Sequence, residues 1–76
     1  MRHVIYYPPG ESRYHGQTLR NCDIAKLLLG RAMRHEHALV QDLVRLNDQY
    51  PGQRWWRHEV VRTPPGQVMR AEADGP

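Results

Sequence analysis

Five histidines in 76 residues raise the question of a metal site in this chain. His35 and His37 flank Glu36, but residues two apart on a helix lie about 200° apart around its axis, so both imidazoles cannot reach one ion. The residues four positions from either histidine are not zinc ligands: Arg31, Leu39, Met33 and Gln41. The other histidines have no spacing that demands a shared ion: His3, His15 and His58. We therefore expect no metal ion and no other cofactor.

The nucleophilic side chains also lack the neighbours that would indicate catalysis. Ser12 is the only serine, and the residues around it do not form the Gly-x-Ser-x-Gly turn of hydrolases. Cys22 is the only cysteine, and a single cysteine at a helix start is more often a small apolar core residue than a nucleophile. The glycines are spread singly and form no phosphate-binding loop. We therefore expect the protein not to be an enzyme.

Size and charge limit the remaining classes of function. A chain of 8.9 kDa with 39% hydrophobic residues and no phenylalanine makes one small domain with a thin core. The net charge is only +3, although all basic residues except Lys26 are arginines. This basic excess is milder than that of a dedicated nucleic-acid-binding protein. A single cysteine excludes an internal disulfide.

Apolar segments give no sign of membrane insertion or export. The longest apolar run is Leu27-Leu28-Leu29, far short of the ~20 residues of a membrane-spanning helix. The N-terminal residues lack the long apolar region that signal peptides carry. We therefore expect a cytoplasmic protein.

Proline and glycine divide the chain into short elements. Tight turns are favoured at Pro8-Pro9-Gly10, Pro51-Gly52 and Pro64-Pro65-Gly66. Residues 4–7 and 60–63 each begin with a β-branched pair and predict strands that end at a proline. Weaker strands are expected within residues 12–19 and 67–70.

One long helix is expected between these strands. Asn21 is suited to cap its N-terminus, and no proline interrupts the chain from Cys22 to Asn47. At 100° per residue, the apolar side chains form one broad face: Ala25, Leu28, Leu29, Ala32, Leu39, Val40, Leu43 and Leu46. Gly30 interrupts the good helix formers and marks a place for a bend or a break.

These elements predict an α+β fold, in which a small sheet of three or four strands packs on one long helix, bent or broken at Gly30. Residues 1–70 should form the domain, and residues 71–76 should be a disordered tail. Alternation in the C-terminal strand predicts that Trp56 faces the helix and Trp55 faces away from it, or the reverse.

Glu36 lies in the middle of the apolar face of the expected helix, and three explanations are open. The helix bends at Gly30 and rotates Glu36 out to water. Alternatively, the carboxylate is buried and pairs with an arginine of the sheet, such as Arg57 or Arg62. In the third explanation, part of this face is not core and binds a partner.

Arginine and tryptophan gather in the segment Arg54-Trp55-Trp56-Arg57, a composition typical of protein interfaces. A domain with so small a core has little reason to expose a tryptophan unless a partner covers it. We therefore expect Trp55 to anchor a protein partner, with Arg54 and Arg57 beside it. The other expected partner-binding residues are Arg34, Arg45, Tyr6 and Tyr7.

Single-stranded or duplex nucleic acid is the alternative partner. Arginine and aromatic side chains also hold phosphates and stack on bases. A basic strip could be formed by Arg31, Arg34, Arg45, Arg54 and Arg57. Acidic residues are interspersed with this strip, and the sequence contains no helix-turn-helix or RNA-binding aromatic motif.

In size, layout and composition, the chain from Val4 to Val68 resembles the small bacteriophage-encoded proteins that disable host machinery. It is most similar in style to phage inhibitors of bacterial RNA polymerase and next to anti-CRISPR proteins. These proteins share no sequence motif, so the resemblance carries over no residue roles. It implies a stoichiometric inhibitor that occupies a surface of host RNA polymerase in the host cytoplasm. The oligomeric state stays open.

Overall fold

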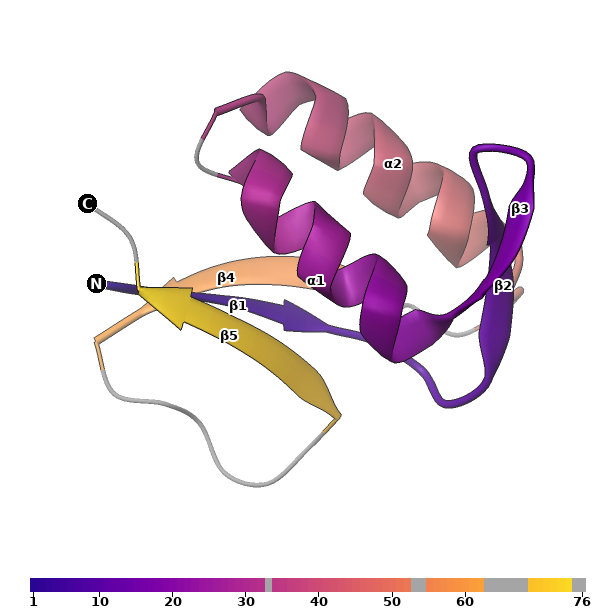
Figure 1. Ribbon diagram of the computed structural model, residues 1–76, viewed down its shortest axis with the longest axis horizontal. Coiled ribbons are helices and arrows are strands. Elements are labelled where there is room, and N and C mark those ends of the chain that lie inside the picture. The colour runs from indigo at the N-terminus through magenta and orange to yellow at the C-terminus, as the bar shows by residue number, and fades with distance from the viewer. Residues whose placement is uncertain (33, 53–54, 63–68, 75–76) are drawn as a thin grey trace.

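The computed structural model describes residues 1–32, 34–52, 55–62 and 69–74. Five strands and two helices follow one another along this part of the chain (Figure 1): β1 (Arg2–Tyr6), β2 (Glu11–Tyr14), β3 (Gln17–Arg20), α1 (Asn21–Ala32), α2 (Glu36–Asp48), β4 (Arg57–Val61) and β5 (Arg70–Asp74). The expected α+β class is confirmed.

β1 is the central strand of a three-stranded antiparallel sheet with the order β4-β1-β5. Directly opposed residues share a face of the sheet. Ile5 pairs with His58 and Ala71 and belongs to the core, so its row faces the helices. Tyr6 pairs with Arg57, and its row faces the other way. This second side, called the outer face below, carries Arg2, Val4, Tyr6, Arg57, Glu59, Val61, Arg70, Glu72 and Asp74.

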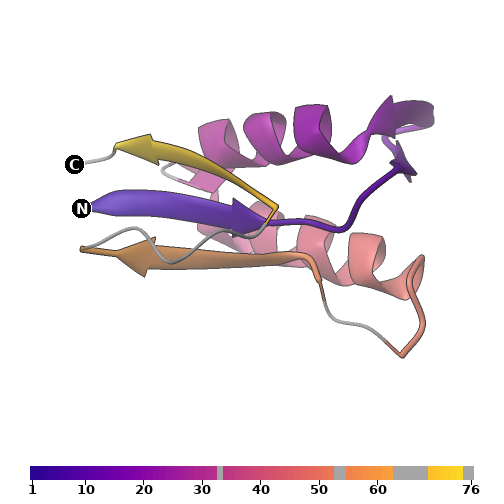
Figure 2. The same cartoon turned by 90° about the horizontal axis from the view of Figure 1, so that it is seen from below.

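Both helices lie on the same side of the sheet, with α1 toward β5 and α2 toward β4 (Figures 1 and 2). The expectation of one long helix is wrong. A single helix over residues 22–47 would be roughly 39 Å long at 1.5 Å per residue, whereas the longest dimension of the structure is 31 Å. Two helices of 12 and 13 residues can lie side by side over a short sheet and bury both apolar faces.

The chain leaves the first helix after Ala32, and Gly30 lies inside α1. The backbone N–H of His35 donates to the carbonyl of Arg31 at 2.8 Å and closes the turn between the helices. Glu36 then begins α2 and is exposed to solvent. Glu36 thus faces water, as the first of the three explanations predicted, but the bend at Gly30 that it invoked is wrong, because the chain breaks after Ala32.

β2 and β3 form a separate hairpin beside the ends of the helices. Its turn uses His15 and Gly16, whose φ angles of 50° and 78° lie in the left-handed region that a tight hairpin turn requires. Gln49 extends the hairpin, because its side-chain amide accepts from the N–H of Arg13 at 2.9 Å and donates to the carbonyl of Arg13 at 2.8 Å. The single weak strand expected within residues 12–19 is thus a pair of strands.

Trp56 is the largest fully buried side chain and joins the sheet to α2. The side chain of Asn47 accepts from its N–H at 3.0 Å and donates to its carbonyl at 2.8 Å. Trp55 is 36% exposed, so the predicted division of the two tryptophans is confirmed. The rest of the core lies between the sheet and the helices and includes Ile5, Ile24, Leu28, Leu39 and Leu46.

The C-terminal segment is not a tail up to Asp74. β5 pairs along its whole length with β1, from Arg70 opposite Tyr6 to Asp74 opposite Arg2. The expectation of disorder from residue 71 is wrong, because β1 has two edges whose backbone groups need partners, and β5 satisfies the second edge. Composition alone does not predict this strand, because its residues favour strands only weakly.

Candidate protein-interaction surfaces

Tyr6 and Arg57 meet on the outer face of the sheet. The Arg57 guanidinium lies 4.2 Å from the centroid of the Tyr6 ring, a cation–π contact. Burial raises the pKa of the Tyr6 phenol, and the neighbouring Glu59 carboxylate raises it further. Tyr6 itself is buried, which corrects its expected place at a partner surface. The ring instead positions the two charged side chains above it.

The other charges of the outer face are also paired. Arg2 contacts Glu72 at 3.1 Å and Asp74 at 3.3 Å, and Arg70 donates to Glu72. These hydrogen bonds, first that from Arg70, hold the pKa of Glu72 below its usual value. Arg57 contacts Glu59 at 3.4 Å. These arginines of the outer face are therefore paired with carboxylates. A surface that binds phosphates would instead present arginines without acidic partners.

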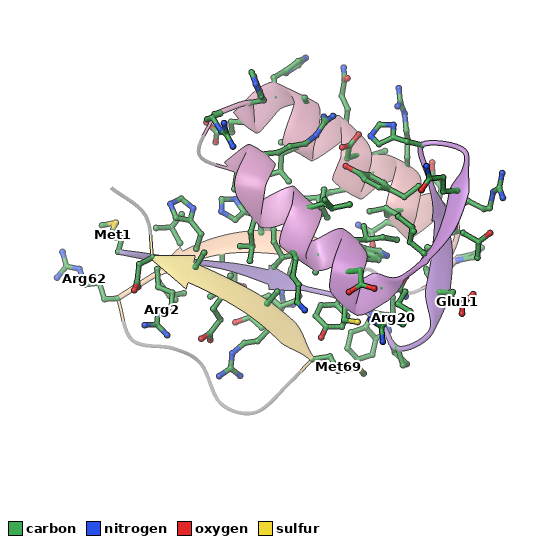
Figure 3. The ribbon with its side chains drawn as sticks, viewed as in Figure 1. Met1, Arg2, Glu11, Arg20, Arg62 and Met69 are labelled. Atoms are coloured by element: carbon green, nitrogen blue, oxygen red, sulfur yellow. The ribbon has the colours of Figure 1, made fainter. Side chains whose placement is uncertain are left out.

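An open groove of about 430 Å³ lies where β1 leaves the sheet. Its walls are mostly apolar and come from the β1–β2 connection, the start of α1 and the residue before β5: Tyr7, Pro8, Pro9, Gly10, Cys22 and Met69. Its polar lining comes from Glu11, Arg20 and Asn21. Figure 3 shows Met69, Arg20 and Glu11 at this end of the molecule. We call this feature the Tyr7 groove.

Hydrogen bonds hold the walls of the Tyr7 groove in place. The side-chain amide of Asn21 donates to the carbonyls of Pro8 at 3.0 Å and Pro9 at 3.2 Å. The backbone N–H of Tyr7 donates to the carbonyl of Met69 at 3.3 Å. Asn21 thus begins α1 at the predicted place, and its amide secures the preceding turn. The Met69 side chain is 39% exposed and can adapt its shape to a ligand.

A second apolar surface runs between α2 and β4. Val40 and Val44 are 52% and 56% exposed and share one helix stripe with Asn47. Since Asn47 binds the residue before β4, this stripe borders the sheet edge. Val60, on the helix side of β4, is 48% exposed, and Trp55 lies before the strand. We call Val40, Val44, Trp55 and Val60 the α2–β4 strip.

A buried carboxylate, Asp42, ties α2 to the hairpin and to α1. Asp42 accepts a hydrogen bond from Tyr14 at 2.8 Å and contacts Arg31 at 3.4 Å and His15 at 3.8 Å. Burial, followed by this carboxylate, raises the pKa of Tyr14 to about 12. The cavity beside them, about 50 Å³, is also lined by Arg45. Because Arg31 balances its charge, we interpret Asp42 as a structural residue that holds α1, α2 and the hairpin together.

His3 and His58 stack on the helix side of the sheet. Their rings are 5.2 Å apart and parallel within 2°, and His3 Nδ1 lies 3.0 Å from His58 Nε2. Burial, and then the nearby His3, lower the pKa of His58, while Glu36 opposes this shift. In the described residues, no group of three or more His, Cys, Asp and Glu side chains is placed to hold a metal ion.

The structure separates the residues expected to bind a partner. Trp55 and Arg57 lie together at the start of β4, and both are exposed. Arg34 is exposed in the connection between the helices, and Arg45 lies on the hairpin side of α2. Arg54 falls outside the described residues. The described arginines of the strip expected for nucleic acid come from α1, the connection between the helices, α2 and β4: Arg31, Arg34, Arg45 and Arg57.

Tyr7 is the one expected partner-binding residue that lines the groove. Sequence reasoning missed its neighbours, because Pro8 and Pro9 were interpreted only as a turn, and Met69 comes from the far end of the chain. It also placed Val40 in the core, since a single long helix gives it the wrong face. Had two shorter helices been predicted, the spacing of four residues between Val40 and Val44 would have placed both valines on one exposed stripe of the second helix.

No family model, no curated protein and no solved structure matches this chain. Within the described residues, neither helix has the length and apolar character needed to cross a membrane.

Proposed function

We propose that the protein is a non-catalytic binding module, which regulates or inhibits a larger protein by docking against it through the Tyr7 groove. The observation that carries this proposal is an open, mostly apolar groove of about 430 Å³ beside the exposed thioether of Met69. Such a groove accepts an apolar side chain of a partner while polar groups at the rim fix its orientation.

The occupant that fits best is an extended segment of the partner protein with one large apolar side chain. The groove is bounded by the Tyr7 ring and by two consecutive prolines, surfaces that pack well against an extended chain. Glu11 gives the rim an acid, whereas the base Arg20 already binds Asp23 at 2.9 Å, so a basic residue of the partner beside Glu11 would set its direction.

A protein partner is favoured over nucleic acid by the arrangement of charge. The arginines described on the outer face are paired with Glu59, Glu72 and Asp74, and Arg31 is paired with Asp42. Cations held by carboxylates have less to gain from phosphate, since binding must first break these pairs. We retain bacterial RNA polymerase as the favoured target, on the resemblance to phage inhibitors, with an anti-CRISPR role as the alternative.

Affinity capture tests this proposal. The immobilised chain is incubated with a bacterial lysate treated with nuclease, and the bound proteins are identified by mass spectrometry. We expect one protein complex, with RNA polymerase subunits first, to be enriched and to be displaced by excess free chain. If nuclease treatment removes all specific enrichment, a protein-binding function is wrong.

A gel shift examines the nucleic-acid alternative separately. Binding through phosphates would give a shift of single-stranded oligonucleotides at ~50 mM salt that weakens steeply at ~200 mM salt. We expect no shift at either salt concentration. A strong shift at low salt would favour the nucleic-acid function over the protein-binding one.

A further inference from the structure

The strand β4 forms one edge of the sheet, and a hydrogen bond on the far side of β1 shows which of its backbone groups face outward. The N–H of Tyr7 donates to the carbonyl of Met69, the next pair in the register of β1 with β5. Backbone groups alternate between the two sides of a strand, so the odd-numbered residues of β1 bond to β5 and the even-numbered ones to β4. The partners of the even-numbered residues are Arg57, Glu59 and Val61. His58 and Val60, which lie between these partners, therefore direct their N–H and C=O groups away from β1.

Trp56 follows the same alternation, and its outward groups are already bound. The side-chain amide of Asn47 accepts from the N–H of Trp56 at 3.0 Å and donates to its carbonyl at 2.8 Å. One amide thus exchanges two hydrogen bonds with one strand residue, as a residue of a neighbouring antiparallel strand does. In the described parts of the chain, no strand or side chain binds the outward groups of His58 and Val60. Asn47 therefore shows which kind of group this edge accepts, and two further positions are open to it.

The α2–β4 strip gives these two open positions an apolar border. α2 runs in the opposite direction to β4 (Figure 1), so its stripe passes from Asn47, beside Trp56, to Val44 and then to Val40 along the edge. Both valines are more than half exposed, and Val60 on β4 is 48% exposed. Alternate side chains of a strand added at this edge would lie against this apolar surface.

The outer face of the sheet determines which charges such a strand should carry. Arg57 and Glu59 flank His58 on that face, and their side chains are 57% and 42% exposed. Opposite charges directly across two strands are favourable, whereas like charges are unfavourable. The matching strand therefore has a basic residue across from Glu59 and an acidic residue across from Arg57. Its residues across from His58 and Val60 face the helices and are apolar.

We propose that the β4 edge is a second interaction surface, on which an extended segment of a partner protein adds one short strand beside His58 and Val60. The main-chain amides of the segment exchange hydrogen bonds with the outward groups of both residues. Its apolar side chains pack on the α2–β4 strip, and its charged side chains pair with those of the outer face. Asn47 limits the added strand at one end, because it already occupies the place beside Trp56. The Tyr7 groove borders β5, across the sheet from this edge, so neither surface depends on the other.

A synthetic peptide titrated into isotope-labelled protein tests this surface by NMR. The probe is acetyl-Thr-Val-Lys-Val-Glu-amide. In antiparallel orientation, its valines lie across from Val60 and His58. Its lysine then meets Glu59, and its glutamate meets Arg57. We expect a dissociation constant below about 3 mM, with the largest changes in chemical shift at the backbone amides of His58 and Val60.

Two control peptides separate strand pairing from unspecific contact. The peptide with lysine and glutamate exchanged has the same composition but places like charges across from each other, and it should bind at least about fivefold more weakly. The peptide with both valines N-methylated keeps every side chain but cannot donate to β4, and it should not bind.

A substitution at Val60 tests the edge from the side of the protein. Val60→Pro removes an outward N–H and leaves the β1–β4 ladder in place, because proline is tolerated where the N–H of an edge strand faces solvent. This variant should keep the spectrum of a folded chain and lose peptide binding. Val60→Thr keeps the N–H and should bind the peptide as the wild-type protein does.

Three results would overturn the proposal. The first is the absence of shifts at His58 and Val60 with the probe up to about 5 mM. The second is a control peptide that binds as tightly as the probe. The third is a shift of these two amides when the protein alone is diluted, which would show that a second copy covers the edge. Affinity capture with a bait altered in the Tyr7 groove is independent of all three, so the two surfaces can fail separately.

Discussion

Arg57 lies directly across the β1–β4 ladder from Tyr6, with its guanidinium 4.2 Å from the centroid of the phenol ring. Tyr6 lies on the side of the sheet that the helices do not cover, and the Arg57 guanidinium helps to bury its ring there. The contact therefore holds the Arg57 side chain in place at the start of β4.

Substitutions at Tyr6 should separate the ring from its hydroxyl. Tyr6→Ala removes a buried ring and should lower the free energy of unfolding by about 3–5 kcal/mol. Tyr6→Phe keeps the ring beneath Arg57 and should cost only about 1 kcal/mol. Urea unfolding followed by circular dichroism measures both. Equal, small losses for the two variants would show that the ring is not part of the core.

The contact between Asn47 and Trp56 should be among the most costly polar contacts to remove. Asn47→Ala leaves the Trp56 N–H and carbonyl without their partners, and we expect a loss of about 2 kcal/mol in the free energy of unfolding. Gln49→Ala is the matched control, since it also removes two hydrogen bonds to one backbone residue, but at an exposed site. Water can replace these bonds, so the control should lose less than about 1 kcal/mol. A larger loss in the control would contradict this view of the α2–β4 junction.

Stability should fall as the pH drops below about 6.5 because of His58. Its pKa is lowered in the folded chain by burial and by His3 from β1, with Glu36 from α2 opposing the shift. The unfolded chain therefore binds a proton more readily, so protonation favours unfolding over this window. Unfolding free energies at pH 7.5 and 5.5 measure the effect.

Two histidine variants isolate the source of this pH dependence. His58→Gln should remove much of the difference between the two pH values. His37→Gln, on the exposed side of α2, should leave that difference as it is in the wild-type protein. If both variants behave alike, the pH dependence does not come from the stacked pair.

Local patterns in the sequence predicted the strands around β1 and β4 and the division of the two tryptophans. Because successive side chains of a strand point to opposite faces, Trp56 lies on the same face as His58 and Trp55 lies on the other face. The strand end at Tyr6 was also predictable, since the prolines that follow cannot continue a ladder.

The two helices and the last strand depend on tertiary contacts that local patterns do not contain. No single residue enforces the break after Ala32; the length of the sheet does, because one long helix would project beyond it. β5 forms because β1 has a second edge to satisfy, although residues such as Ala71 and Glu72 favour strands weakly. The buried position of Tyr6 depends on side chains from across the sheet.

The candidate surfaces were predicted only in part. Tyr7 was expected to contact a partner, but the groove around it also needs Met69, which is brought close by the pairing of β5 with β1. Arg34 and Arg45 were also expected to bind a partner; Arg34 is exposed in the connection between the helices, and Arg45 lines the small cavity beside Asp42. The prediction that Trp55 and Arg57 form an interface stays a prediction.

The measurement that tests the binding function most directly compares affinity capture by three baits from one bacterial lysate. Met69→Glu places a charge in the Tyr7 groove, whereas Leu27→Glu places the same charge on an exposed apolar position of α1 outside it. We expect the wild-type and Leu27→Glu baits to retain the same protein and Met69→Glu to lose at least about nine-tenths of it, a loss near 1.4 kcal/mol in binding. Capture by Met69→Glu equal to that of the wild-type bait would contradict the proposed role of the groove.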